Sequence, residues 1–248
     1  MRGSVAKLAA STASAAVWAS ATACSIPEKY LVDVPPFSCL GQPLPAVASP
    51  QITIAGTLTD RVNGAVLANT AVEAYLVGMP TPIFMTASNA GGSFTRDQVT
   101  GGAPSNLFVH ALPSGYLETY FYPAVPVSKG LNATIQAITA SDLVTIGAVA
   151  QVAVDTAKVN FLISVVDCNG APVPGATITT VPAGPIRYFA GQAPSPSAVA
   201  TDAITGAALV MNVPADNTLI NATVAGMTLR SHAVGGVAGA VIQTEIQP

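Results

Sequence analysis

The sequence predicts an all-β protein, built as two tandem antiparallel β-sandwiches with one short connecting helix. Its 248 residues include 21 Gly and 20 Pro, which interrupt the apolar runs at short intervals and favour short strands and turns. Half of the residues are hydrophobic and only 8% are charged, against an average of about 25%. This balance is the reverse of that in disordered chains. A strand-turn-strand pattern also occurs twice.

The repeated pattern is an alternating strand that ends at Asp, a turn through Asn-Gly, and a returning strand. The two copies run over residues 52–75 and 159–180. Asn-Gly tolerates the positive φ angles of tight turns, so it is the strongest short signal for a strand reversal. Further strands are expected over residues 106–111, 116–122, 219–224 and 240–246. The turn residues are Asp60, Asn63, Gly64, Asp167, Asn169 and Gly170.

The domain organisation follows from these patterns. We expect one short helix between the two modules, because Ser141 can serve as its N-cap and Leu143, Ile146 and Ala150 fall on one face. The β-branched Val144 and Ile146 leave a strand as the alternative there. The predicted segments are a signal peptide (1–23), a Pro-rich leader (24–50), a first module (51–130), a linker with the helix (131–156) and a second module (157–248).

The first 23 residues have the order of an export signal. Arg2 and Lys7 precede a mildly apolar, Ala-rich stretch that ends in small residues before Cys24. The alternative is an Ala-rich N-terminal helix. Two cleavages compete at the same bond, because Ala21-Thr22-Ala23 suits ordinary signal peptidase, whereas the same residues followed by Cys24 are similar to a bacterial lipobox. Ala21 stands where a lipobox usually has Leu.

The three cysteines favour lipidation of Cys24. If a lipid thioether uses Cys24, the remaining Cys39 and Cys168 can form one disulfide in an oxidising compartment. The alternative is three free or mispaired thiols. The expected location is therefore the outer membrane or cell surface as a lipoprotein, or the periplasm or medium if Cys24 is not acylated.

Residues 167–178, with the later turn at Gly206, resemble the carboxypeptidase regulatory-like family. The resemblance covers about residues 159–246 and is weaker over 52–127, where Asn69 replaces the usual Gly. It implies sandwiches of transthyretin-like or immunoglobulin-like topology, which typically serve as non-catalytic spacers or binding units on exported proteins. Residues 37–41 together with Cys168 also resemble two-module lipoproteins of the myxobacterial type. That likeness implies a Cys39–Cys168 disulfide between the leader and the second module.

The sequence predicts no catalytic residue, metal site or cofactor. His110 and His232 are isolated, no Gly-x-Ser-x-Gly elbow accompanies them, and we expect structural or solvent-exposed roles for both. The carboxylates are scattered rather than clustered as calcium would require. The formal charge is −3, so the chain lacks the basic surface that nucleic-acid binding needs.

One aromatic stretch suggests a ligand. On a strand, Tyr116, Glu118, Tyr120 and Tyr122 share one face, where aromatic rings could stack on sugars. The alternative is that these rings cover the core and their hydroxyls reach water. We therefore expect a non-enzymatic envelope lipoprotein that contacts the membrane through its lipid and interacts with envelope proteins or glycans. A carbohydrate-binding protein using this face is the second hypothesis, and an exported hydrolase the third.

Overall fold

The computed structural model describes residues 35–248, which fold mainly into β-strands. The predicted signal peptide and Cys24 lie outside the described residues. The described residues belong to one compact unit. The elements are β1 (Gln51–Asp60), β2 (Ala71–Leu76), β3 (Phe84–Ala87), β4 (Ser93–Val99), β5 (Leu107–Leu112), β6 (Thr119–Tyr122), β7 (Gly130–Ala137), α1 (Ala140–Val149), β8 (Val159–Val165), β9 (Ala176–Val181), β10 (Ile186–Ala190), β11 (Ala193–Pro194), β12 (Ala207–Val213), β13 (Asn217–Val224), β14 (Met227–Thr228), β15 (His232–Gly235) and β16 (Val241–Ile246).

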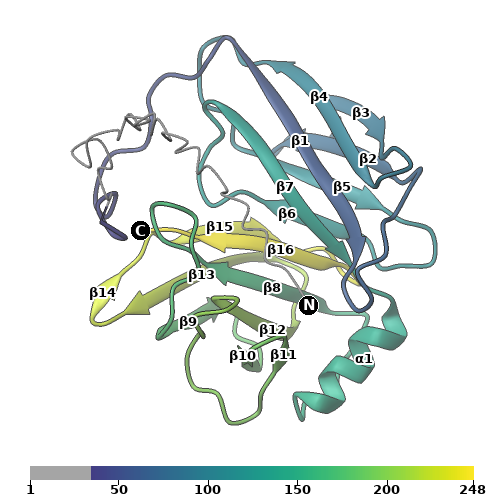
Figure 1. The fold of residues 1–248 in the computed structure, drawn as a ribbon, viewed down its shortest axis with the longest axis vertical. Coiled ribbons are helices and arrows are strands. Elements are labelled where there is room, and N and C mark those ends of the chain that lie inside the picture. Colours follow the sequence, from purple (N-terminus) through teal and green to yellow (C-terminus); the bar gives the residue numbers. More distant parts are fainter. Residues whose placement is uncertain (1–34) are drawn as a thin grey trace, which may run out of the picture. The chain divides into compact units, whose positions relative to one another are not determined.

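The strands form three sheets, shown in Figure 1. One has three strands in the order β4-β1-β7, and one has nine in the order β11-β10-β12-β8-β16-β6-β5-β2-β3. In the third, β13 pairs with β9, β14 and β15. The prediction of a mostly β fold with one short helix is confirmed. We call β1 to β7 the N-terminal sandwich and β8 to β16 the C-terminal sandwich.

The nine-stranded sheet runs through both sandwiches. Strand β6 pairs with β16 in parallel, with Thr119 opposite Val241 and Tyr122 opposite Thr244. The pairs β1–β7 and β8–β16 are parallel as well, where the sequence predicted antiparallel sandwiches. In two separate sandwiches, β6 and β16 would each have an edge with unpaired backbone groups. Their pairing gives these groups hydrogen-bond partners.

The two hydrophobic cores lie on opposite faces of this shared sheet. Residues that are paired between neighbouring strands point to the same face of the sheet. Phe121 and Gln243 therefore share one face, and Tyr120 and Ile242 share the other. We call the face of Phe121 the front face and the face of Tyr120 the back face. The front face carries the core beneath β4-β1-β7, whereas the back face carries the core between the shared sheet and β9 and β13. Each sandwich therefore leaves part of one face of the shared sheet for other elements to cover.

Helix α1 covers part of the front face in the C-terminal sandwich. Leu143, Ile146 and Ala150 pack into apolar clusters on that face, as their spacing predicted, so the strand alternative is wrong. The N-cap is Thr139 rather than Ser141, because the Thr139 side chain accepts a hydrogen bond from the backbone N of Asp142 at 3.1 Å. Residues 131–137, which the sequence placed in a linker, form most of β7.

An Asp carboxylate holds each of the two repeated turns. The carboxylate of Asp60 accepts the N–H of Val62 at 2.7 Å, and the carboxylate of Asp167 accepts the N–H of Asn169 at 2.8 Å. Asn69, which stands where the pattern usually has Gly, has a φ of 54°. The side chain of Asn tolerates this left-handed region better than most, so the replacement preserves the backbone path.

Candidate functional site

The leader is joined to the C-terminal sandwich by the predicted disulfide. Cys39 and Cys168 are bonded, with their Cα atoms 5.7 Å apart, which confirms the predicted pairing. The backbone N of Cys168 donates to the carbonyl of Pro36 at 2.9 Å, and Phe37 and Leu40 pack against the C-terminal core. This end of the leader is thus fixed by a covalent bond, a backbone hydrogen bond and apolar contacts.

The other end of the leader lies along the N-terminal sandwich. The N–H of Ala48 donates to the carbonyl of Gly102 at 2.9 Å, and the N–H of Ser49 donates to the carbonyl of Ser128 at 2.8 Å. Ala48 is buried. The leader therefore contacts both sandwiches before the first strand begins.

The predicted glycan face is not an exposed platform. Tyr120 and Tyr122 are only 9% and 5% exposed and belong to the C-terminal core, as the core-covering alternative predicted. Tyr116 lies in the turn that precedes β6, and its hydroxyl donates to the carboxylate of Asp60 at 2.9 Å. A sugar ring therefore cannot stack on Tyr120 or Tyr122, and Tyr116 does not share their face. Only Glu118 stays beside Tyr120, accepting its hydroxyl at 3.1 Å.

A polar cluster on the back face surrounds His110. Its Nδ1 lies 3.4 Å from a carboxylate oxygen of Glu73 and its Nε2 lies 3.2 Å from one of Glu118. The imidazole stacks on Tyr120, with ring centroids 4.2 Å apart. Burial raises the pKa of the Tyr120 hydroxyl and raises that of Tyr122 to about 12. His110 is isolated in the sequence, because Glu73 and Glu118 come close to it only in the folded sheet.

His232 is half-buried, not exposed. It begins β15, and its Nδ1 lies 3.0 Å from the hydroxyl of Thr244. Burial lowers the pKa of the imidazole. His232 lies at a strand end, and β15 pairs with β13.

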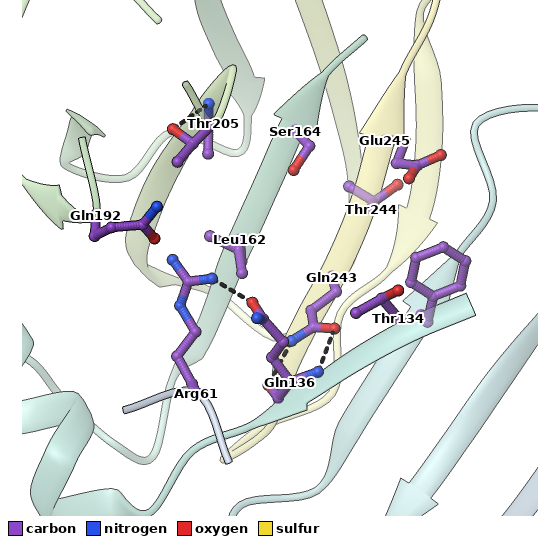
Figure 2. A pocket seen from close by; sticks show the side chains of 12 residues that line it. Arg61, Thr134, Gln136, Leu162, Ser164, Gln192, Thr205, Gln243, Thr244 and Glu245 are labelled. Atoms are coloured by element: carbon purple, nitrogen blue, oxygen red, sulfur yellow. Dashed lines mark hydrogen bonds between the residues drawn. The ribbon is translucent and has the colours of Figure 1, made fainter. Parts of the chain in front are cut away.

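A polar cleft lies on the front face of the C-terminal sandwich, beside residues of the N-terminal sandwich. It has a volume of about 310 Å³ and is lined by residues of β7, β8, β12 and β16 together with Arg61 (Figure 2). Leu162, Ser164 and Ala207 form its floor, because these alternate residues of β8 and β12 point to the front face. Gln243 and Glu245 of β16 extend the floor toward β7.

Arg61 projects into this cleft from the turn after β1. The turn is fixed by the carboxylate of Asp60, whose pKa is lowered chiefly by the N–H of Asn63. The guanidinium donates to the side-chain oxygen of Gln136 and lies over the ring of Phe189, 5.2 Å from its centroid. Burial lowers the pKa of Arg61, but arginine stays protonated in proteins. The cleft therefore contains a fixed positive charge.

Several polar side chains around Arg61 are unpartnered. Among residues 35–248, the side chains of Thr134, Ser164, Gln192 and Glu245 make no hydrogen bond to another residue. Burial raises the pKa of Glu245. Figure 2 shows Arg61 and Glu245 at opposite ends of the cleft. The sequence did not reveal this site, because its members come from distant strands and match no motif.

The described part of the chain offers neither a metal-binding cluster nor a candidate membrane helix. Residues 35–248 contain no group of three His, Cys, Asp or Glu side chains placed to hold a metal ion. Over the same range, no helix has the length and apolar character that crossing a membrane would take.

Comparisons with known proteins show distant structural similarity only. No family model matches the chain, and no curated protein matches it. A TIE protein of Bacillus anthracis is 13% identical over 79% of this chain, with a TM-score of 0.28. A streptococcal ancillary pilin is 9% identical over 80%, at 0.27, and a putative carbohydrate binding protein from Bacteroides uniformis is 11% identical over 76%, at 0.30.

The extent of these matches differs between the three structures. The chain covers 34% of the TIE protein and 62% of the ancillary pilin, so it spans less than two thirds of either, whereas it covers 98% of the Bacteroides protein.

Proposed function

We propose that the chain is a non-enzymatic exported lipoprotein that presents two β-sandwiches for structural or interaction roles at the cell envelope. The observation that carries the proposal is the Cys39–Cys168 disulfide. Disulfides form and persist in oxidising compartments outside the cytoplasm. The pairing uses two of the three cysteines in the sequence, so Cys24 remains for a lipid.

The joining of the two sandwiches supports a scaffold role. The shared sheet and the leader both connect them, so the pair would move as one body on its anchor. This suits the rigid spacers and binding units that the carboxypeptidase regulatory-like resemblance implies, and membership of that family is part of the proposal. Partners would be envelope proteins or glycans, with the membrane reached through the lipid.

Intact mass of protein extracted from bacterial membranes tests the anchor. We expect cleavage before Cys24, an added acyl mass on Cys24, and a loss of two hydrogens at Cys39 and Cys168. The Cys24→Ser variant should move to the soluble exported fraction. A mature chain that starts at Cys24 with no acyl mass would reject the lipid and leave a periplasmic or secreted protein.

A hydrolase assay tests the non-enzymatic part of the proposal. Purified mature protein should show no turnover on a panel of esters, peptides and glycosides. Hydrolysis that copurifies with the protein and is abolished by one point substitution would overturn this part. The His110→Gln variant is the first to test, because His110 contacts two carboxylates.

A further inference from the structure

The Arg61 guanidinium in this cleft has no carboxylate partner within the described chain. Within residues 35–248, the ion pairs present involve His110, and no carboxylate oxygen lies within 4.0 Å of the Arg61 guanidinium. The guanidinium donates one N–H to the side-chain oxygen of Gln136, and its other N–H donors remain available to a ligand. A guanidinium held in this way matches a carboxylate, which it can bind through two parallel hydrogen bonds.

The geometry of Arg61 is set before any ligand arrives. Gln136 holds one edge of the guanidinium and Phe189 lies against its plane. Gln136 is itself fixed, because the side chain of Gln243 hydrogen-bonds both its backbone N and its backbone O. A preorganised donor loses less conformational entropy when it binds a ligand.

The remaining free groups suit the hydroxyls of a sugar. Thr134 and Ser164 offer hydroxyls, Gln192 offers an amide, and Glu245 offers a carboxylate that accepts hydrogen bonds. Leu162 adds a half-buried apolar patch on the floor, against which the C–H face of a ring could lie. A fatty acid or an apolar peptide end would leave most of these polar groups without a partner.

We propose that this cleft binds an acidic saccharide, with the sugar carboxylate held by Arg61 and the ring hydroxyls held by the polar groups toward Glu245. The separation of Arg61 and Glu245 to opposite ends keeps the ligand carboxylate away from the acidic side chain (Figure 2). The volume of about 310 Å³ is at the lower end for small-molecule pockets and suits a short saccharide. This site is independent of the lipid at Cys24 and of the buried tyrosines.

Isothermal titration calorimetry of the full mature chain with defined sugars tests the site. The probes are D-glucuronate and D-galacturonate, their methyl esters, the parent neutral sugars, and acetate. We expect at least one uronate to bind, its methyl ester and the neutral sugar to bind at least tenfold more weakly, and acetate to compete poorly.

Substitutions locate the binding. Arg61→Gln should weaken uronate binding at least tenfold, and Arg61→Lys should keep part of it, because the charge stays while the fork is lost. Arg96→Gln is the matched control, since Arg96 lies exposed on β4 and its loss changes the charge equally. Thermal unfolding of each variant verifies that the fold is retained.

Four results would overturn the proposal. These are no binding of either uronate at the highest soluble concentration, equal binding of acid and ester, equal losses for Arg61→Gln and Arg96→Gln, or acetate competing as well as the uronate. The proposed lipid anchor fails by a different result, the absence of acyl mass and of a membrane-bound fraction, so the two outcomes are distinguishable.

Discussion

The side chain of Gln243 pairs with the backbone of Gln136 as a neighbouring strand would. Its Oε1 accepts the Gln136 N–H at 3.1 Å, and its Nε2 donates to the Gln136 carbonyl. Strand β7 is an edge strand of the three-stranded sheet, so these backbone groups have no other strand to bond. One glutamine of β16 thus connects the sheet of the N-terminal sandwich to the front face of the shared sheet.

Gln243→Leu should lower the free energy of unfolding by about 1–3 kcal/mol, because it leaves a backbone donor and acceptor without partners. Urea unfolding measures the change. Gln192→Leu removes an amide from the same cleft, but Gln192 is exposed and makes no side-chain hydrogen bond in the described chain, so the expected change is within about 0.5 kcal/mol. Equal losses in the two variants would contradict this account of the junction.

Removing the disulfide should cost about 2–4 kcal/mol of stability, since the bond restricts the unfolded chain. The double variant Cys39→Ser with Cys168→Ser should match the reduced wild-type protein in urea unfolding. A reducing agent should destabilise the wild type and leave the double variant unchanged. If the wild type is insensitive to reduction, the bond does not contribute as expected.

Gly206 should tolerate a side chain less well than Gly170. Both have positive φ angles, 60° and 81°, so Ala at either position costs about 1–2 kcal/mol for the left-handed backbone. A Cβ at Gly206 would also lie 2.5 Å from the carbonyl oxygen of Val165, whereas a Cβ at Gly170 meets open space. Gly206→Ala should therefore reduce the unfolding free energy more than Gly170→Ala. The reverse order in urea unfolding would show that crowding against Val165 does not limit this position.

Glu245→Gln should stabilise the protein at neutral pH. Burial raises the folded-state pKa of Glu245 above its usual value of 4.5, so folding favours the protonated form and relative stability falls as pH rises through that range. Gln mimics the protonated acid. The gain measured by urea unfolding should be present at pH 7, shrink as the pH falls through the raised folded-state pKa, and reach its minimum below about pH 4, where Glu245 is protonated in both states. A gain that is independent of pH would point to another cause.

Tyr122→Ala should reduce the unfolding free energy by about 3–5 kcal/mol, the usual cost of truncating a large core residue. Tyr122→Phe retains the ring and should cost far less. Uronate binding to Tyr122→Phe should equal that of the wild type in calorimetry, because Tyr122 is on the back face and the cleft is on the front face. Loss of binding in this variant would indicate that the tyrosine face takes part in glycan binding.

The features that the sequence predicted well depend on neighbouring residues. The Asp and Asn-Gly turns, the helix and its packed face, and the mostly β fold follow from local spacing. The Cys39–Cys168 pairing was predictable because only three cysteines are present and the sequence predicts lipidation of one of them. The proposed cleavage before Cys24 stays a prediction.

The features that the sequence did not predict depend on contacts between distant strands. No local pattern specifies that β6 pairs with β16, because strand propensity depends on the neighbours that a strand acquires in the folded protein. Tyr120 and Tyr122 are buried in the C-terminal core. The alternation of residues along the strand predicted that they share a face, but it did not predict that this face is covered. Tyr116 departs from the alternation because a turn that begins at Pro113 precedes β6. Arg61 and Glu245 line one cleft although they are far apart in the sequence.

The disulfide has a mechanical consequence. Tension that enters the chain ahead of Cys39 passes through the sulfur bridge to Cys168 and continues along the C-terminal sandwich. The covalent loop between these cysteines contains the whole N-terminal sandwich and helix α1, so neither lies on the shortest covalent path that bears the load. A pull on the leader would therefore strain the C-terminal sandwich first, while the intact bridge keeps the loop from being drawn out as an extended chain.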